Sequence, residues 1–499
     1  MPRICMRRVV FEHGGRGPFA TPFDLDLEPG WTGVVGPNGV GKTTLLRLIA
    51  GELACTSGSI RLCKAPAGPR VLAQTVDWTP TLAAELERFA HDWSARAGRL
   101  RSRLQLDPEA LGRWPTLSPG ERKRWQLGAA LADEPPILLC DEPGNHLDAR
   151  ARALLIETLQ ELDGVGLIIS HERELLDALC DAIVFIDPGG RIERRPGNYA
   201  AASAQREADH AHRRTEFEQA RRAERRLASQ VQAAREQQAK TERSRRSSSR
   251  KRDHRDHDAS SMARKYRADR AATSASAGLR RTQSSHARAR AAVEGFEIDH
   301  RHFGELFVDW APPRKSTLLS LTPAELAEYA PHPFTRLPED RAVTIERDTR
   351  VHVAGDNGSG KTSLLRALVA RARASLGEER ILWMPQELDA DARRALLELF
   401  RGSGPSRARV LQIFAAAGGD PDALACTPIP SPGEARKLCL ALGLARRAWL
   451  LVLDEPTNHL DLPAREAHER MLRAYPGALL ISSHDRRFAE ELTNTCWTL

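Results

Sequence analysis

The chain has 499 residues, of which 41% are hydrophobic and 28% charged, and it carries a net charge of +8. This length suggests roughly two to four domains, and no segment approaches the roughly 18 consecutive apolar residues of a membrane span. Integral membrane proteins are therefore excluded. The basic N-terminus has no apolar stretch behind it, so no secretory signal is expected. Eight cysteines without a CxxC pair argue against a disulfide scaffold or zinc site and favour the cytoplasm.

The positive charge is concentrated in the middle of the chain. Residues 201–290 contain 24 Lys and Arg against 11 Asp and Glu, a local net charge of +13 that leaves −5 for the rest. Such segregation favours a nucleic acid or another acidic surface as partner. A solvated, arginine-rich linker is the alternative, and the charge alone does not decide between the two.

Four motifs occur twice in the same order. The first copies begin at Gly36, Ser118, Asp141 and Ser170, and the second at Gly355, Ser431, Asp454 and Ser483. The two copies are 319 residues apart at the first motif and 313 at the other three. A constant spacing predicts two copies of one domain, here residues 1–200 and 293–499.

Each copy opens with the pattern of a phosphate-binding loop, placed between a strand-like segment and a Leu-rich helical one. The glycines let backbone N–H groups surround phosphates, the lysine reaches the β- and γ-phosphates, and the threonine offers a hydroxyl to Mg²⁺. The predicted nucleotide-binding residues are Gly36, Pro37, Asn38, Gly39, Val40, Gly41, Lys42, Thr43 and Thr44 in the first copy, and Gly355, Asp356, Asn357, Gly358, Ser359, Gly360, Lys361, Thr362 and Ser363 in the second. Thr43 and Thr362 are also predicted Mg²⁺ ligands.

The Ser-Pro-Gly-Glu motif of each copy opens a predicted helix. Its serine hydroxyl and backbone N–H groups would form an anion-binding helix N-terminus. An ordinary helix cap has the same sequence, but the position within the motif order favours recognition of a γ-phosphate across an interface. The residues concerned are Ser118, Gly120 and Glu121 in the first copy, and Ser431, Gly433 and Glu434 in the second.

An Asp-Glu pair ends an apolar, strand-like segment in each copy. A buried parallel strand brings its last residues to the sheet edge where phosphates bind. We predict that Asp141 and Asp454 hold Mg²⁺. The next residues, Glu142 and Glu455, are predicted to polarise the attacking water.

A histidine follows the aspartate of each acidic pair by 30 residues, at the end of another apolar run. A single histidine is usually structural, but the repeated spacing predicts that His171 and His484 sense the γ-phosphate. Gln74 and Gln386 also occupy matching places. These glutamines are predicted to contact Mg²⁺ or water.

The segment between the copies contains neither Gly nor Pro over residues 198–277 and is rich in Ala, Arg, Gln and Glu, which favour helices. We predict a helical hairpin over residues 201–292. Its most polar stretch would form the tip at about 243–261, with Gly278 or Gly295 near the end of the second helix. A disordered linker is the alternative, because a helix that is polar all round needs a partner to be stable.

The motif order resembles that of the nucleotide-binding domain of the ATP-binding cassette (ABC) superfamily, here in tandem. This resemblance implies an α/β fold with two P-loop ATPase domains of RecA-like core, joined by the helical hairpin. It also implies a monomer whose cassettes pair head to tail around two ATP molecules with Mg²⁺. The loop of each copy would then face the Ser-Pro-Gly-Glu motif of the other.

Three further features resemble the ABC-F family of translation and antibiotic-resistance factors. They are the absence of membrane spans, the AsnHisLeuAsp boxes at 145–148 and 458–461, and a charged linker that opens with Gly197-Asn198-Tyr199. The resemblance implies a cytoplasmic ATPase that binds the ribosome at the tRNA exit region without an obligate transmembrane partner. Residues 243–255 would contact rRNA or tRNA. The short first copy favours the ribosome-protection type over general translation factors.

Two other functions stay open. A soluble tandem ATPase could drive an ABC transporter, although such motors do not need a basic hairpin between their cassettes. A DNA-acting ABC ATPase could instead use the linker on branched DNA.

Overall fold

A computed structural model describes residues 1–13, 16–73, 76, 78–144, 149–250, 258–294, 307, 310–322, 325, 343–356 and 358–499. Contacts divide the chain into two compact units, of which one comprises Met1–Ala202 with Arg301–Leu499 and the other Ser203–His300. We call the elements from β1 to β9 the first cassette and those from β10 to β16 the second cassette. Both belong to the first unit.

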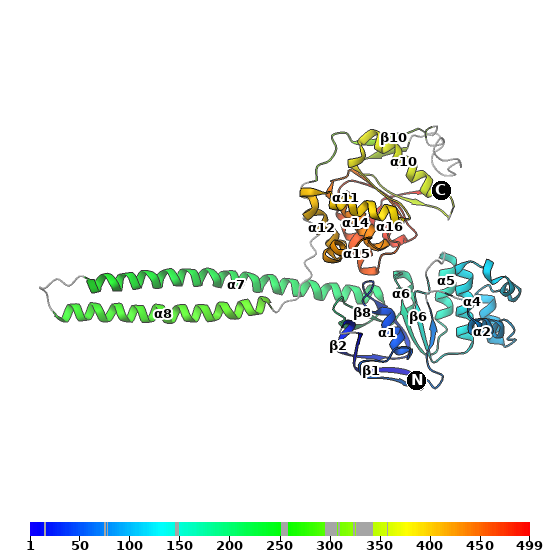
Figure 1. The fold of residues 1–499 in the computed structure, drawn as a ribbon, viewed down its shortest axis with the longest axis horizontal. Coiled ribbons are helices and arrows are strands. Elements are labelled where there is room, and N and C mark those ends of the chain that lie inside the picture. The colour runs from blue at the N-terminus through cyan, green and yellow to red at the C-terminus, as the bar shows by residue number, and fades with distance from the viewer. Residues whose placement is uncertain are drawn as a thin grey trace. The chain divides into compact units, whose positions relative to one another are not determined.

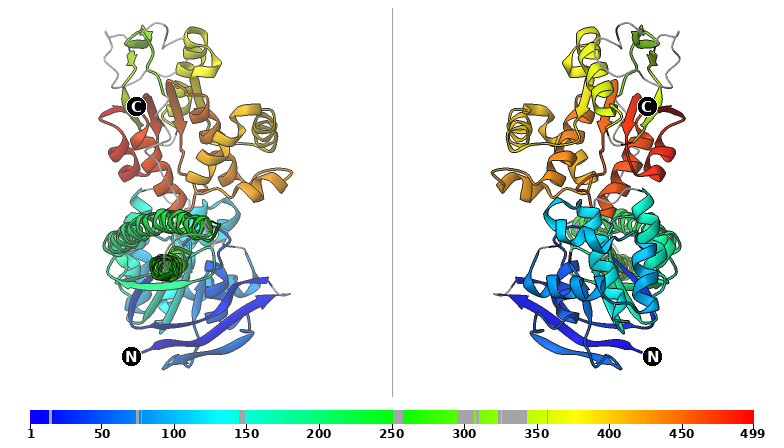
Figure 2. Two further views of the ribbon diagram at one scale, coloured as in Figure 1. Left: turned by 90° about the vertical axis from the view of Figure 1, so that its left-hand side faces the viewer. Right: turned by 90° about the vertical axis from the view of Figure 1, so that its right-hand side faces the viewer.

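The first cassette is built on a six-stranded sheet of order β5-β6-β7-β3-β8-β9 (Figure 1). Neighbouring strands are parallel except for β8 and β9. The strands are β3 (Gly30–Val35), β5 (Arg70–Leu72), β6 (Ile137–Asp141), β7 (Val165–Ile169), β8 (Ala182–Ile186) and β9 (Ile192–Pro196). A separate antiparallel sheet of order β2-β1-β4 forms a layer of its own in Figure 2. Its strands are β1 (Arg3–His13), β2 (Arg16–Leu27) and β4 (Ser57–Cys63).

Two apolar clusters cover the two faces of the six-stranded sheet. Leu138 and Cys140 of β6 belong to one cluster, and Ile137 and Leu139 belong to the other, as the alternation of side chains along a strand requires. The helices are α1 (Lys42–Ile49), α2 (Pro80–Ala90), α3 (Ala95–Arg103), η1 (Pro108–Thr116), α4 (Pro119–Ala132), α5 (Ala149–Leu159) and α6 (Arg173–Leu179).

The second cassette repeats this plan. Its parallel sheet has the order β13-β14-β15-β12-β16, the counterpart of β5-β6-β7-β3-β8. The strands are β12 (Arg350–Ala354), β13 (Ile381–Met384), β14 (Leu450–Asp454), β15 (Ala478–Ser482) and β16 (Thr495–Thr498), with β10 (Thr317–Leu321) and β11 (Val343–Glu346) in a separate pair. The helices are α10 (Lys361–Leu376), η3 (Glu378–Arg380), α11 (Ala390–Arg401), η4 (Gly404–Ser406), α12 (Arg407–Ala416), α13 (Pro421–Cys426), α14 (Pro432–Ala445), α15 (Leu462–Ala474) and α16 (Arg486–Leu492). The predicted tandem α/β fold is confirmed.

The basic segment forms two long helices, α7 (Tyr199–Arg250) and α8 (Asp258–Glu294), which run side by side (Figures 1 and 2). His286 Nε2 lies 2.9 Å from Glu224 Oε1, and Gln238 Nε2 donates to Ser276 Oγ at 3.4 Å. Residues farther along α7 thus meet residues earlier in α8, so the helices are antiparallel. The hairpin is confirmed over the alternative of a disordered linker.

The stretch predicted as the tip is helical at both of its ends. Helix α7 continues to Arg250 and α8 begins at Asp258, so both extend into the stretch predicted as the tip, and only residues 251–257 of it lie outside the described residues. Arginine is a good helix former and serine costs only about 0.5 kcal/mol, so the polar stretch does not have to end the helices. Gly278 lies inside α8 rather than near its end, and Gly295 lies outside the described residues.

No helix in the described part of the chain is long and apolar enough to cross a membrane.

Leu451 lies in the middle of β14 and is 0% exposed. Leu451→Ala should lower the free energy of unfolding of the second cassette by about 2–5 kcal/mol, because the removed methyl groups leave a cavity. Urea denaturation followed by far-UV circular dichroism measures this change. Leu399→Ala is the matched control, since Leu399 is 47% exposed and its substitution should change stability by only about 0.5 kcal/mol. Equal losses for the two variants would contradict the packing described.

Candidate nucleotide sites

Each phosphate-binding loop connects a central strand to a helix, β3 to α1 and β12 to α10. In the first loop Gly39 and Gly41 have φ angles of 79° and 105°. In the second, Gly358 and Gly360 have φ angles of 85° and 95°. Glycine adopts this left-handed region without the steric cost of a Cβ atom, so the repeated glycines allow the loop to turn directly into the helix.

The lysine of each loop folds back onto its own loop. Lys42 Nζ donates to the carbonyls of Gly36 at 2.8 Å and Pro37 at 3.0 Å. Lys361 Nζ donates to the matching carbonyls, at 2.7 and 3.0 Å. Burial lowers the pKa of Lys42, so binding an anion beside it would favour its charged form.

A hydrogen bond joins each loop to the acidic strand of its cassette. Thr43 Oγ1 donates to Asp141 Oδ2 at 2.8 Å, and Thr362 Oγ1 donates to Asp454 Oδ2 at 2.7 Å. A hydroxyl and a carboxylate oxygen are ligands that Mg²⁺ prefers in proteins. The two pairs therefore fit a Mg²⁺ ion that also binds the phosphates of a nucleotide.

The glutamate after each aspartate has a strained backbone and a buried side chain. The φ angles of Glu142 and Glu455 are 47° and 48°, in the left-handed region that residues other than glycine rarely adopt. Their N–H groups donate to the carbonyl oxygens of Ile169 at 3.0 Å and Ser482 at 2.8 Å on the neighbouring strands. The Oε1 atom of each glutamate is buried without a hydrogen-bond partner in the described structure. Backbone strain and a buried polar oxygen of this kind are typical of functional sites.

A histidine lies beside each of these glutamates. His171 Nε2 is 3.1 Å from Glu142 Oε1, without the alignment of a hydrogen bond. The corresponding distance from His484 Nε2 to Glu455 Oε1 is 3.5 Å. The structure therefore places both predicted pairs together.

Burial changes the proton affinity of these groups. It raises the pKa of Glu142 to about 8 and that of Glu455 to about 7. It also lowers the pKa of His171 to about 3, and that of His484 in the same direction. At neutral pH these shifts favour the uncharged form of both histidines, and they make each glutamate a stronger proton acceptor than an exposed carboxylate.

The Ser-Pro-Gly-Glu motifs begin α4 and α14, as predicted, and each forms a capping box. Glu121 N donates to Ser118 Oγ at 3.2 Å, and Ser118 N donates to Glu121 Oε2 at 2.8 Å. Ser431 and Glu434 make the same two contacts, at 3.3 and 2.8 Å. A helix cap explains these bonds, so the recognition of a γ-phosphate stays a prediction.

A cavity of about 2140 Å³ lies between the two cassettes, and many of the predicted site residues line it. The residues that line it include Pro37, Asn38, Ser118, Gly120, Glu121, Glu142, His171, Gly355, Asp356, Gly358, Lys361, Gln386, Ser431, Gly433, Glu434, Glu455 and His484. Gln74, Asn357 and the box at 145–148 lie outside the described residues.

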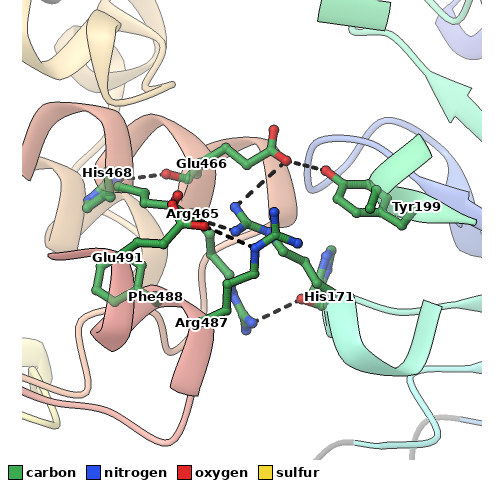
Figure 3. Close-up of polar contacts among 12 residues, drawn as sticks. His171, Tyr199, Arg465, Glu466, His468, Arg487, Phe488 and Glu491 are labelled. Carbon is green, nitrogen blue, oxygen red and sulfur yellow. Dashed lines mark hydrogen bonds and ion pairs between the residues drawn. The ribbon is translucent and has the colours of Figure 1, made fainter. Parts of the chain in front are cut away.

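Direct contacts between the cassettes lie around the first site. Asn38 N donates to Asp461 Oδ2 at 2.8 Å, and Arg465 Nη1 donates to the carbonyl oxygen of His171 at 3.0 Å; the second contact is drawn in Figure 3. The side chain of His171 is 16% exposed and that of His484 is 55% exposed. Sequence reasoning missed Arg465. The available signal was an arginine four residues after each AsnHisLeuAsp box, at Arg152 and Arg465.

Comparisons with known proteins agree with this geometry. The "ABC transporter" family model matches residues 21–145. The chain is 28% identical to the ribosome protection protein VmlR of Bacillus subtilis, over 93% of this chain and 80% of VmlR. It is 29% identical to the tylosin resistance ATP-binding protein TlrC of Streptomyces fradiae, over 94% of this chain and 92% of TlrC. A solved complex of archaeal ribosomal stalk protein aP1 with ribosome recycling factor aABCE1 matches in fold, with a TM-score of 0.56, 19% identity and coverage of 98% of this chain and 87% of that one.

Two cassettes, each with a phosphate-binding loop, an acidic strand end and a histidine, define a tandem ABC ATPase, which binds and hydrolyses ATP. The chain's similarity to VmlR and TlrC, over more than nine tenths of its length, supports the predicted ABC-F family. The predictions of fold class and enzymatic activity are confirmed.

The pKa of Glu142 predicts how stability changes with pH. Burial raises this pKa from 4.5 to about 8, so the folded protein holds the proton more tightly than the unfolded chain does. The free energy of unfolding therefore falls as the pH rises between these two values. Glu142→Gln removes this titration, and its thermal midpoint should rise relative to that of the wild type between about pH 5 and pH 8.5. Thermal unfolding without nucleotide or divalent ions measures the difference. Glu398→Gln, at an exposed position, should show a constant difference, and a constant difference for Glu142→Gln would contradict the shift.

Proposed function

We propose that this chain is a monomeric, ribosome-binding ATPase whose basic hairpin acts on rRNA or tRNA and protects translation against an antibiotic. The observation that carries the proposal is the hairpin itself, two long helices in a segment whose net charge is +13 over residues 201–290. VmlR and TlrC are named for ribosome protection and tylosin resistance, and both match this chain over more than nine tenths of its length.

The exposed arginines of the hairpin support a nucleic-acid partner. They stand on both helices, at Arg213, Arg221, Arg222, Arg225, Arg226, Arg235 and Arg243 of α7 and at Arg267, Arg270, Arg280, Arg281, Arg288 and Arg290 of α8. A guanidinium group binds phosphate with two parallel hydrogen bonds. Such contacts give affinity and orientation with little sequence reading, which suits a folded RNA surface.

The cassettes would supply the nucleotide-dependent step. Backbone N–H groups of the loops with Lys42 and Lys361 would bind the phosphates, and Thr43 with Asp141 and Thr362 with Asp454 would hold Mg²⁺. When bound, this ion stabilises the negative charge that develops during phosphoryl transfer. Glu142 and Glu455 would orient and deprotonate the attacking water, and the neutral His171 and His484 would contact the γ-phosphate.

ATP would also join the cassettes. In the proposed closed state the first loop faces Ser431–Glu434 and the second faces Ser118–Glu121, with ATP between them. Because these contacts exist only in the closed state, ATP favours closure and hydrolysis reverses it. Closure would thus be coupled to binding at the ribosome.

Glu142→Gln combined with Glu455→Gln tests the assignment of the glutamates. The double variant should bind ATP like the wild type, because the amides keep the size of the side chains. Its turnover should fall by roughly 10²–10⁴-fold, the scale for loss of an acid–base group. Phosphate release and fluorescent-nucleotide binding measure the two quantities, with Glu398→Gln as the control. Unchanged turnover would refute the assignment.

Co-sedimentation of the same double variant with ribosomes tests the partner. We expect binding with ATP and little binding without it at moderate salt. Changing Arg221, Arg222, Arg225 and Arg226 to Gln should flatten the slope of log affinity against log salt by about three, since up to four phosphate contacts are lost. The matched control changes Arg61, Arg99, Arg371 and Arg394, exposed arginines of the cassettes. ATP-independent binding, or equal effects of the two quadruple variants, would contradict the proposal.

A further inference from the structure

Arg465 connects the second cassette to the first ATP site. It stands in the first turn of α15, and its Nε donates to the carbonyl oxygen of Leu460 at 3.1 Å, so the base of its guanidinium is held by its own cassette. Its Nη1 crosses to the carbonyl oxygen of His171 at 3.0 Å (Figure 3). His171 Nε2 in turn lies 3.1 Å from Glu142 Oε1. One arginine therefore contacts the backbone of the residue that stands beside the glutamate of the other cassette.

The charge of Arg465 is not neutralised by these two carbonyls. The acidic groups that act on it are Asp485, Glu142 and Glu172, and Arg173 opposes them. The half-buried guanidinium therefore lies among acidic groups of both cassettes, Asp485 of its own cassette and Glu142 and Glu172 of the first. A carbonyl that accepts from a charged donor is held more tightly than one that accepts from a neutral group.

Other residues of the second cassette hold α15 against the first cassette. The ion pair of Arg173 Nη1 with Glu469 Oε2 is 2.8 Å long, and each side chain is only 9% exposed. The hydroxyl of Tyr199 donates to Glu466 (Figure 3), and Asn38 N donates to Asp461 at 2.8 Å. Separating the partners of a buried ion pair is strongly destabilising, because each charge is then left buried and unpaired. These contacts therefore hold α15, and with it Arg465, in place against the first cassette.

The matching helix of the first cassette is built differently. At the spacing of 313 residues, Ala153 and Ile156 of α5 stand where the second cassette has Glu466 and Glu469. Arg152, the counterpart of Arg465, forms ion pairs within its own cassette, at 2.7 Å with Glu172 and 3.8 Å with Glu174. The acidic contacts that dock α15 therefore have no equivalent side chains in α5.

We propose that Arg465 is a positioning residue that the second cassette supplies to the first ATP site. By holding the carbonyl of His171, it keeps the imidazole beside Glu142, so turnover at the first site depends on the docked second cassette. Turnover at the second site does not need Arg465. The inference rests on the proposed roles of Glu142 and Glu455.

Turnover of each site can be measured separately. Glu455→Gln leaves the first site active, and Glu142→Gln leaves the second. Adding Arg465→Gln to the Glu455→Gln protein should lower kcat by about 10- to 100-fold, the scale for a hydrogen bond to a charged group, with a smaller change in KM. The same substitution in the Glu142→Gln protein should leave kcat within about twofold. Arg465→Lys should restore part of the loss, because an ammonium can still donate to the carbonyl.

Arg470→Gln is the matched control, since Arg470 lies on the same helix at an exposed position; it should leave both backgrounds unchanged. Equal losses in the two backgrounds would overturn the proposal and make Arg465 a general structural residue. A change in KM without a fall in kcat, or no change in either quantity, would overturn it as well.

A second measurement does not depend on the glutamates. Otherwise wild-type protein is labelled with 8-azido-ATP under vanadate trapping, and the peptides of the two loops are quantified by mass spectrometry. Arg465→Gln should reduce trapping at the peptide of Lys42 and spare that of Lys361. Equal trapping at both would overturn the inference, whereas failure of only the glutamate variants to lose turnover would overturn the proposed catalytic roles.

Discussion

The constraint on which the sites depend is the complete burial of two short parallel strands, β6 and β14. All five residues of each strand are buried, and apolar side chains alternate between the clusters on the two faces. The first residues that can be polar are therefore those at the carboxyl end, Asp141 and Asp454. In the sheet, β6 lies two strands from β3, with β7 between them. The carboxyl end of β6 therefore lies near the loop that follows β3, and the hydrogen bond from Thr43 to Asp141 joins the two.

The same burial explains the chemistry of the glutamates. The residue after each strand must turn away from the sheet, and the left-handed backbone of Glu142 and Glu455 makes this turn while keeping the carboxyl group out of water. An unpaired oxygen and a raised pKa follow from the same placement. A water molecule held by such a carboxylate would face a proton acceptor suited to neutral pH.

Much of this site could be predicted from the sequence, because loop, acidic pair and histidine are each fixed by local backbone geometry and recur at constant spacing. The role of Arg465 could not be predicted, because it depends on how α15 of the second cassette packs against the first cassette. A local sequence pattern contains no information on that packing. The exact extent of the hairpin helices could not be predicted either. The helix propensities of Arg and Ser differ by only a few tenths of a kcal/mol, so the composition does not mark a helix boundary.

The two cassettes share a strand order, but they differ in the side chains with which α5 and α15 face the other cassette. Duplication supplies equivalent loops and acidic strands, whereas the residues that dock α15 occur on one side only: Glu466 and Glu469 oppose Tyr199 and Arg173, while α5 has Ala153 and Ile156. Tyr199 is also the first residue of α7. Glu466 therefore holds the start of the hairpin helix, and its neighbour Arg465 holds the histidine of the first site. Movement of α15 away from the first cassette would break both contacts. The same movement would therefore release the histidine of the first ATP site and the first residue of α7.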